Sequence, residues 1–154
     1  MATFAEIDND NIVLRIIKVD DAEAPNPNTG EQYCNTLFGG NWRQCSYNTS
    51  GNVHGEGGTP FRKNMPAIGW IWDSEKNGFV EPQPYDSWTL NDDTCLWDPP
   101  IARPSTQDAG GVFVYGNTWI EATQRWEATE YDNNDIPTSN KFYWNPSTSA
   151  WVAI

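Results

Sequence analysis

The sequence has no long hydrophobic run and few basic residues. Its most apolar stretch, from Ile12 to Val19, is interrupted by Arg15 and Lys18 and is much shorter than the roughly 20 apolar residues of a membrane-spanning helix. Nine Lys and Arg stand against 21 Asp and Glu, so the formal net charge is −12. This charge opposes binding to phosphate backbones and to anionic membrane surfaces. We therefore expect neither a nucleic-acid partner nor a membrane partner.

Cysteine is scarce as well. Cys34, Cys45 and Cys95 are an odd number and contain no CxxC pair, so the sequence indicates neither a zinc site nor a dense disulfide framework. Buried free thiols are the favoured interpretation, and a single disulfide stays open. The first ten residues carry acids where a secretory signal peptide carries Lys or Arg, so we expect no such signal.

Motifs for catalysis are missing too. The only histidine, His54, lies in a Gly-rich stretch with Glu56 as its one acidic neighbour, and nothing there would orient it as a catalytic base or a metal ligand. The patterns GxGxxG, GxxxxGK[ST] and GxSxG do not occur. We therefore expect a non-enzymatic protein without a cofactor or a metal. A glycosidase that uses two carboxylates is a weaker alternative, because the sequence does not show how far apart such a pair would lie.

Aromatic and turn-forming residues are abundant instead. Nine Trp, six Tyr and six Phe, in a chain that is 38% hydrophobic, supply enough apolar surface for the core of a 154-residue protein. Eleven Pro and 12 Gly favour short elements joined by turns. We predict a mainly β fold in which short antiparallel hairpins form a small sandwich or barrel-like domain with long loops. Residues 1–104 would form the main β domain, and residues 105–154 a C-terminal hairpin subdomain or extension.

The N-terminal segment predicts a β-hairpin. Its strands, Phe4–Ile7 and Ile12–Val19, are rich in β-branched residues and flank the Asx-rich turn Asp8–Asn11. After the hairpin, the pattern predicts in order a surface loop, a short helix or strand, and a further strand, over residues 20–30, 33–38 and 42–47.

Two acidic segments, Asp8–Asn11 and Asp132–Asp135, resemble calcium-binding loops in composition. Neither keeps the Gly at position six or the Glu at position twelve of the EF-hand pattern. Asp and Asn favour turns without any metal, so we predict that both segments are turns.

Two similar aromatic hairpins are predicted 72 residues apart. Trp72 and Asp73 precede the turn-forming pair Asn77-Gly78, and Phe79-Val80 follow it. The C-terminal segment repeats this order, with Trp, Asn, Trp and Val at positions 144, 145, 151 and 152. A further hairpin is expected with its two-residue turn at Gly116-Asn117. Residues 118–131 also tolerate a helix, which their weak apolar stripe disfavours.

Residues 48–66 form a Gly-rich segment in which we expect no helix or strand. Such a long structureless loop usually marks either function or disorder, so a floppy surface excursion and a loop that orders against a partner both stay open. In the second interpretation the segment is a candidate assembly loop, with residues His54, Arg62, Lys63 and Asn64 at its contact surface.

Aromatic residues cluster downstream of this loop and form a candidate contact surface: Trp70, Trp72, Tyr85, Trp88 and Trp97. Exposed in a row, such flat rings could stack on sugar faces. Buried, each ring removes roughly 150–250 Å² from water, which would stabilise a core or a protein interface. Core packing or a protein interface is the favoured interpretation, and glycan binding is the alternative.

Several blocks of the chain together resemble a family of small virion-associated structural proteins of tailed phages that infect marine cyanobacteria and related marine bacteria. The blocks are FAEID at residue 4, GGNWRQCSYN at residue 39, GGTPFRKN at residue 57, GWIWD at residue 69, PQPYDSW at residue 82 and CLWDP at residue 95. The resemblance covers residues 1–104. It departs after Pro104, where the family pattern goes almost at once into its final hairpin and this chain inserts residues 105–140.

The resemblance implies a particle component rather than a reaction. It implies a capsid-decorating, fibre or tail-associated subunit on the exterior of the virion, which contacts other virion proteins in homo-oligomeric or symmetric copies. It also implies that Cys34 and Cys95 form a thiol pair, because the family pattern has Cys at both places. The alternative function is a glycan-binding adhesin at a fibre tip that recognises the host surface.

Overall fold

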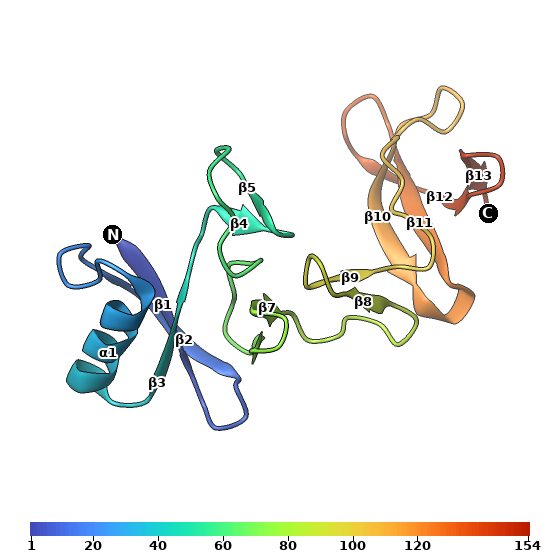
Figure 1. The fold of residues 1–154 in the computed structure, drawn as a ribbon. Coiled ribbons are helices and arrows are strands. Elements are labelled where there is room, and N and C mark those ends of the chain that lie inside the picture. The colour runs from blue at the N-terminus through green and yellow to red at the C-terminus, as the bar shows by residue number, and fades with distance from the viewer. The chain divides into compact units, whose positions relative to one another are not determined.

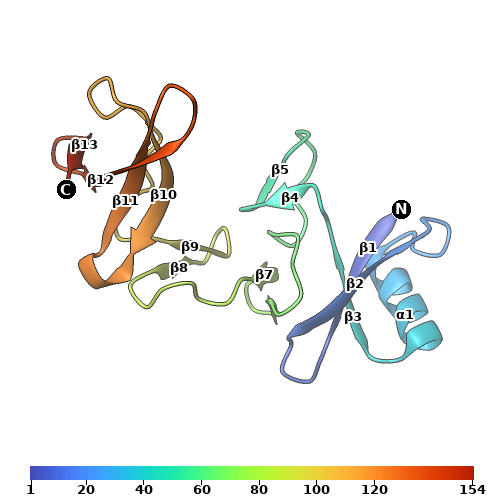
Figure 2. The same cartoon turned by 180° about the vertical axis from the view of Figure 1, so that it is seen from behind.

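A computed structural model describes all 154 residues, and the chain divides into two compact units. Unit 1 comprises Met1–Pro84 and Leu90–Trp97, and unit 2 comprises Tyr85–Thr89 and Asp98–Ile154. The fold is mainly β, its short sheets are antiparallel, and none of them closes into a barrel (Figures 1 and 2). The mainly β prediction is confirmed. The division falls a few residues before the predicted boundary at 104, and the segment 85–89 belongs to the C-terminal unit.

Unit 1 contains one helix and a series of short strands. Its elements are β1 (Ala2–Ile7), β2 (Val13–Val19), α1 (Pro27–Phe38), β3 (Asn41–Cys45), β4 (Thr49–Ser50), β5 (Val53–His54), β6 (Ile71–Asp73) and β7 (Gly78–Val80). The β8–β9 hairpin follows, with bounds Thr89–Asn91 and Leu96–Asp98. The main sheet has the strand order β2-β1-β3, so the predicted N-terminal hairpin forms and β3 pairs with its first strand.

The main sheet of unit 1 buries side chains on both of its faces. Alternation along β1 sends Phe4 to one face and Ala5 to the other, and both are fully buried. Phe4 packs with Cys34 of α1 and with Trp42 of β3. A Cβ at Gly30 would lie 2.2 Å from the Phe4 ring, so only glycine lets the helix approach so closely. On the opposite face, Ala5 belongs to a cluster with residues from β6 and β7.

Helix α1 begins earlier than the sequence pattern indicated. Asn26 caps its N-terminus, since the Asn26 side chain accepts a hydrogen bond of 3.0 Å from the backbone N–H of Thr29. Pro27 occupies the first turn, where its missing N–H would have no partner in any case. The helix therefore starts inside the stretch 20–30 that we expected to be a loop. Residues 33–38, for which the sequence left a helix or a strand open, are helical. Gly39 ends it with a φ of 69°.

The Gly-rich segment 48–66 is folded, contrary to the prediction that it has no strand. It forms the β4–β5 hairpin, and buried Thr49 anchors the rest of it. The Thr49 hydroxyl accepts a hydrogen bond from the Phe61 N–H, and the Thr49 carbonyl accepts one from the Met65 N–H. The order of this segment depends on hydrogen bonds between residues far apart in the sequence, which no local pattern reveals.

Asn64 is the centre of these hydrogen bonds, although it is a polar residue with only 2% of its surface exposed. Its amide nitrogen donates to three carbonyls, those of Phe79, Thr94 and Cys95, over 2.9 to 3.2 Å. Its amide oxygen accepts a 2.7 Å hydrogen bond from the Gly51 N–H. One side chain thus joins the Gly-rich segment, β7 and the turn between β8 and β9.

Unit 2 is a four-stranded antiparallel meander in the order β10-β11-β12-β13. Its elements are β10 (Val114–Ile120), the 3-10 turn η1 (Glu121–Thr123), β11 (Arg125–Tyr131), β12 (Pro137–Asn145) and β13 (Ala150–Ala153). Residues 118–131 are therefore not a helix. The predicted turn at Gly116-Asn117 is wrong as well: this pair forms a register shift inside β10, and the chain reverses at η1, where Gln124 has a φ of 45°. Trp119 and Trp126 lie directly opposite each other on the two strands, with their rings edge to face, and this pair fixes that register.

The predicted aromatic hairpins are confirmed, and a third, partial copy accompanies them. Trp72 pairs with Phe79 in β6–β7, and Trp144 pairs with Trp151 in β12–β13. The β8–β9 hairpin, 18 residues after the first copy, keeps the Asx residue and the closing aromatic ring as Asn91 and Trp97, but has Leu90 in the place of Trp72. In each copy an Asx side chain accepts hydrogen bonds from the backbone of the turn; these residues are Asp73, Asn91 and Asn145. Each turn ends on a non-glycine residue with positive φ; these residues are Asn77, Cys95 and Ser149.

The two acidic segments are turns, as predicted. Asp8 Oδ1 accepts the backbone N–H groups of Asp10 and Ile12. Asp132 Oδ1 accepts those of Asn134 and Ile136 in the same way, and these hydrogen bonds hold the pKa of Asp132 below its usual value.

The core of unit 2 consists largely of tryptophan. Trp119, Trp126 and Trp151 are buried together on one face of the sheet. Trp88, from the segment 85–89, packs its ring 6.2 Å from Trp119 and 6.0 Å from Trp126. Glu121 holds this segment in place: its carboxylate accepts hydrogen bonds from the Trp119 indole and from Ser87, and these hydrogen bonds lower its pKa.

Substitution of Asn64 tests the importance of its hydrogen bonds for unit 1. Asn64→Ala leaves three carbonyls and one N–H without their partner, so the free energy of unfolding should fall by about 3 kcal/mol. Urea denaturation followed by near-UV circular dichroism measures this change. Asn28→Ala, on the exposed side of α1, is the matched control and should change the stability by less than about 0.5 kcal/mol. Equal stabilities of the two variants would contradict the role given to Asn64.

Candidate functional site: an exposed aromatic patch on unit 2

The candidate assembly loop does not present its basic residues to a partner. Arg62 Nη1 donates to Glu31 Oε1 of α1 over 2.7 Å and to the Gln44 carbonyl of β3 over 2.8 Å. Its guanidinium also lies 5.0 Å from the centroid of the Trp72 ring. Lys63 Nζ donates to the carbonyl of Asp92 over 2.5 Å. Together with Asn64, these side chains bind inside unit 1 and stabilise its fold.

His54 has a local structural role as well. Its Nδ1 accepts the backbone N–H groups of Glu56 and Gly58 over 3.2 and 3.1 Å, which closes a turn after β5. No group of three or more His, Cys, Asp or Glu side chains lies close enough together to hold a metal ion.

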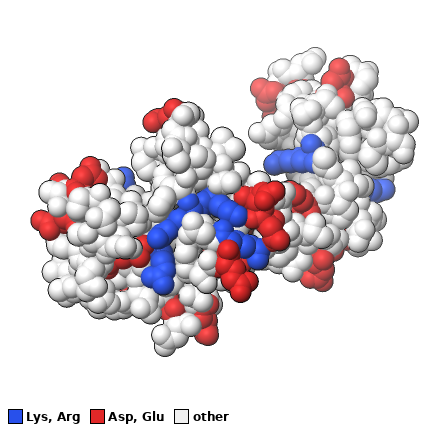
Figure 3. Space-filling view, viewed as in Figure 1, with Lys and Arg blue, Asp and Glu red and all other residues white.

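Basic side chains gather on one face of unit 1, beside acidic ones (Figure 3). The acids neutralise several of them. Lys76 Nζ lies 3.0 Å from Asp73 Oδ2 and 3.6 Å from Asp92 Oδ1. The hydrogen bonds and the charge of Asp73 raise the pKa of Lys76. This face therefore carries internally paired charges.

The candidate aromatic contact surface is largely core. Trp72 is 6% exposed and packs against Phe79, and Trp70 covers the same cluster of unit 1. Trp97 is partly exposed, and its indole N–H donates to the Glu81 carbonyl over 2.7 Å. Tyr85 and Trp88 pack on the core of unit 2. The favoured interpretation, core packing, describes these rings better than a row of exposed stacking platforms.

The three cysteines are free and buried, and the structure does not pair Cys34 with Cys95. Cys34, a residue of α1, lies against Phe4 and Trp42, whereas Cys95 lies in the turn between β8 and β9, beside Gly78. Burial raises the pKa of all three thiols, that of Cys45 to about 12. Protonated, buried thiols are chemically inert at neutral pH.

The exposed aromatic residues lie elsewhere, on the face of the unit 2 sheet opposite the tryptophan core. The register of β10 and β11 sends Val114 and Trp126 to the core face, so their neighbours along each strand point outward. Phe113 and Tyr115 follow this rule and are 45% and 52% exposed. Tyr131 joins them, since its N–H donates to the Phe113 carbonyl over 2.9 Å. We call Phe113, Tyr115 and Tyr131 the aromatic patch.

The three rings of the aromatic patch are in mutual contact. Phe113 and Tyr115 are nearly parallel, with 6.3 Å between their centroids. Tyr131 stands at a steep angle to both, at 6.4 Å from Phe113 and 5.8 Å from Tyr115. A pocket of about 520 Å³ opens beside Phe113 and Tyr131. Its volume is within the range of about 300–1,000 Å³ that is typical of small-ligand sites.

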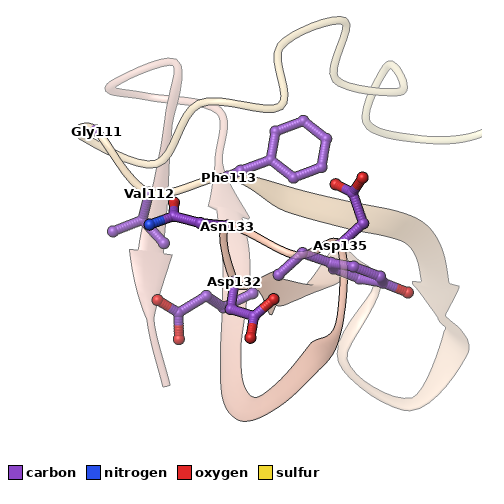
Figure 4. A pocket seen from close by; sticks show the side chains of 8 residues that line it. Gly111, Val112, Phe113, Asp132, Asn133 and Asp135 are labelled. Carbon is purple, nitrogen blue, oxygen red and sulfur yellow. The ribbon is translucent and has the colours of Figure 1, made fainter.

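The rim of this pocket is acidic. Glu130, Asp132 and Asp135 line it, together with Asn133 (Figure 4), and no Lys or Arg contributes to its lining. Asp132 is fixed by the hydrogen bonds of its own turn, in which its Oδ1 accepts the backbone N–H groups of Asn134 and Ile136. A site of this composition attracts neutral or cationic groups that donate hydrogen bonds, and it repels anions.

The sequence contained a signal for the aromatic patch that the predicted turn concealed. Phe113, Val114 and Tyr115 alternate as on a half-buried strand, and Tyr131 lies where the strand after the reversal should end. A turn at Gly116-Asn117 would pair Tyr115 with Thr118. The observed register shift instead pairs Tyr115 with Thr129 and so brings Tyr131 beside Phe113.

These features define a mainly β, two-unit protein with a preformed aromatic and acidic surface pocket. Comparison of the chain with protein-family models, with curated proteins and with solved structures finds no match. No helix of the chain is both long enough and apolar enough to cross a membrane.

Thiol counting tests the state of the cysteines. We expect no reaction with Ellman's reagent in the native protein, because all three thiols are buried, and three reactive thiols per chain in guanidinium chloride. A Cys34–Cys95 disulfide would instead leave one reactive thiol after denaturation without reductant.

Tryptophan substitution tests the assignment of the aromatic residues to core and surface. Trp72→Ala should lower the free energy of unfolding by about 3–5 kcal/mol, because it opens a cavity beside Phe79. Tyr47→Ala, at a position that is 68% exposed, is the control and should change the stability by less than about 0.5 kcal/mol. If Trp72→Ala changed the free energy of unfolding only slightly in urea denaturation, the assignment of Trp72 to the core would be wrong.

Proposed function

We propose that the chain is a non-enzymatic structural component of a tailed-phage virion, located on the exterior of the particle and in contact with other virion proteins in symmetric copies. The resemblance supports this proposal, because the residues that carry it have a common structural role. Trp42, Arg62, Asn64 and Trp72 form the core and the internal hydrogen bonds of unit 1. The likeness is therefore one of fold-forming residues, as expected between proteins of one architecture.

A binding function is supported above all by the aromatic patch. It exposes the rings of Phe113 and Tyr115 beside the half-buried ring of Tyr131, and burial of this surface against another molecule would stabilise a complex. Tyr115 and Tyr131 lie on β10 and β11, and positions on regular strands hold contact residues more firmly than loops do. The patch lies in unit 2, within the part of the chain that departs from the family pattern. We therefore assign attachment to the particle to unit 1 and contact with a further molecule to unit 2.

The net charge of −12 agrees with an exterior position. A surface that faces the packaged genome would meet phosphate groups, and these would repel 21 carboxylates. On the outside, the same charge keeps the particle soluble and separate from other particles.

Analysis of purified particles tests the proposal. We expect mass spectrometry of gradient-purified virions to detect the chain, and immunogold labelling to place it on intact particles. Labelling of the major capsid protein is the control for antibody access. Absence of the chain from the particles, or labelling only after the particles are opened, would contradict the proposal.

A further inference from the structure

The aromatic patch is a continuous platform and not a cage. Its centroid distances of 5.8 to 6.4 Å mean that the three rings touch each other. A methylated ammonium group held between aromatic walls needs a gap that is wider than this. The exposed ring faces are thus suited to a ligand that lies on top of them and presents its own flat apolar face.

Polar groups beside the rings are free to bind. The hydroxyl groups of Tyr115 and Tyr131 make no hydrogen bond within the protein, and neither does the Asp135 carboxylate. With the Asp132 carboxylate and the Asn133 amide, which also line the pocket, these groups supply several acceptors and a few donors at one edge of the platform. A ligand with many hydroxyl groups along its edges would satisfy them.

We infer that the aromatic patch binds a glycan whose sugars are neutral or carry an amine, an inference that rests on the proposed function for its biological meaning. A pyranose ring has an apolar C–H face that can lie on Phe113, Tyr115 and Tyr131, and hydroxyl groups that can donate to Asp132 and Asp135. The site should repel acidic sugars, because three carboxylates and no basic side chain line the pocket.

The site is preformed. The Asx turn at Asp132 holds the acidic rim, and the hydrogen bond from the Tyr131 N–H to Phe113 holds the two strand ends together. Binding therefore requires little ordering of the backbone, which favours affinity for a small ligand. The low pKa of Asp132 keeps this carboxylate ionised, and able to accept hydrogen bonds, in mildly acidic solution.

Binding is tested with the purified full-length chain on three immobilised oligosaccharides: laminarin, which is neutral, chitosan, which carries amines, and alginate, which carries carboxylates. We expect saturable binding to laminarin, to chitosan or to both, and none to alginate. Tyr115→Ala and Tyr131→Ala should weaken this binding by about tenfold or more, through loss of the stacking surface. Tyr47→Ala removes an exposed tyrosine from unit 1 and should leave oligosaccharide binding unchanged.

Three results would overturn the inference: binding to alginate, equal binding by the patch variants and the native chain, or no binding to any of these sugars or to polysaccharide purified from the host surface. Circular dichroism and urea denaturation of each variant separate lost binding from lost folding. Since Tyr115 points away from the core, its variant should unfold at the same urea concentration as the native chain.

Phage that carry Tyr115→Ala separate this inference from the proposed function. A glycan site predicts normal copy number in the virion together with slower adsorption to cells. Loss of the variant chain from the particles would show instead that the patch contacts another virion protein, which would contradict the glycan assignment and leave the virion location intact. Normal incorporation with normal adsorption would overturn the glycan assignment.

Discussion

The fold of unit 1 depends on one buried amide. Asn64 is completely hydrogen-bonded by backbone groups from three segments, and a buried amide that is fully satisfied fixes one arrangement of those segments over all others. The two residues before it, Arg62 and Lys63, have φ values of 51° and 62°, and this backbone conformation brings Asn64 inward while Arg62 reaches α1 and β3. A strained backbone is tolerated here because the surrounding hydrogen bonds determine it.

Packing in both units relies on a few large rings. Two of the hairpins contribute a cross-strand pair of aromatic rings, Trp72 with Phe79 and Trp144 with Trp151. Tryptophan supplies more buried area per residue than any aliphatic side chain, so very short strands are enough to build a core. The sheet of unit 2 packs in this way on one face alone, and its other face is therefore available for recognition.

The sequence predicted those parts of the structure that local chemistry determines. The paired hairpins and both acidic turns followed from Asx residues that hydrogen-bond to the backbone a few positions away, as Asp73 and Asp132 do. The Gly-rich segment was mispredicted because Asn64 binds carbonyls as far away as Cys95. The aromatic patch was missed because a register shift inside β10 selects its neighbours, and the proline at position 27 concealed a helix start.

The threefold use of one hairpin has a kinetic consequence. In each copy the Asx residue, the residue with positive φ and the closing aromatic ring lie within seven positions. These local contacts therefore set the strand register early in folding, before contacts between distant segments form. Hairpins of this size form in about 1–10 μs, long before distant segments meet. The slow step in folding should then be the association of finished hairpins with β1–β3 and α1, and the local turn sequences protect the chain from pairing strands in the wrong register on the way.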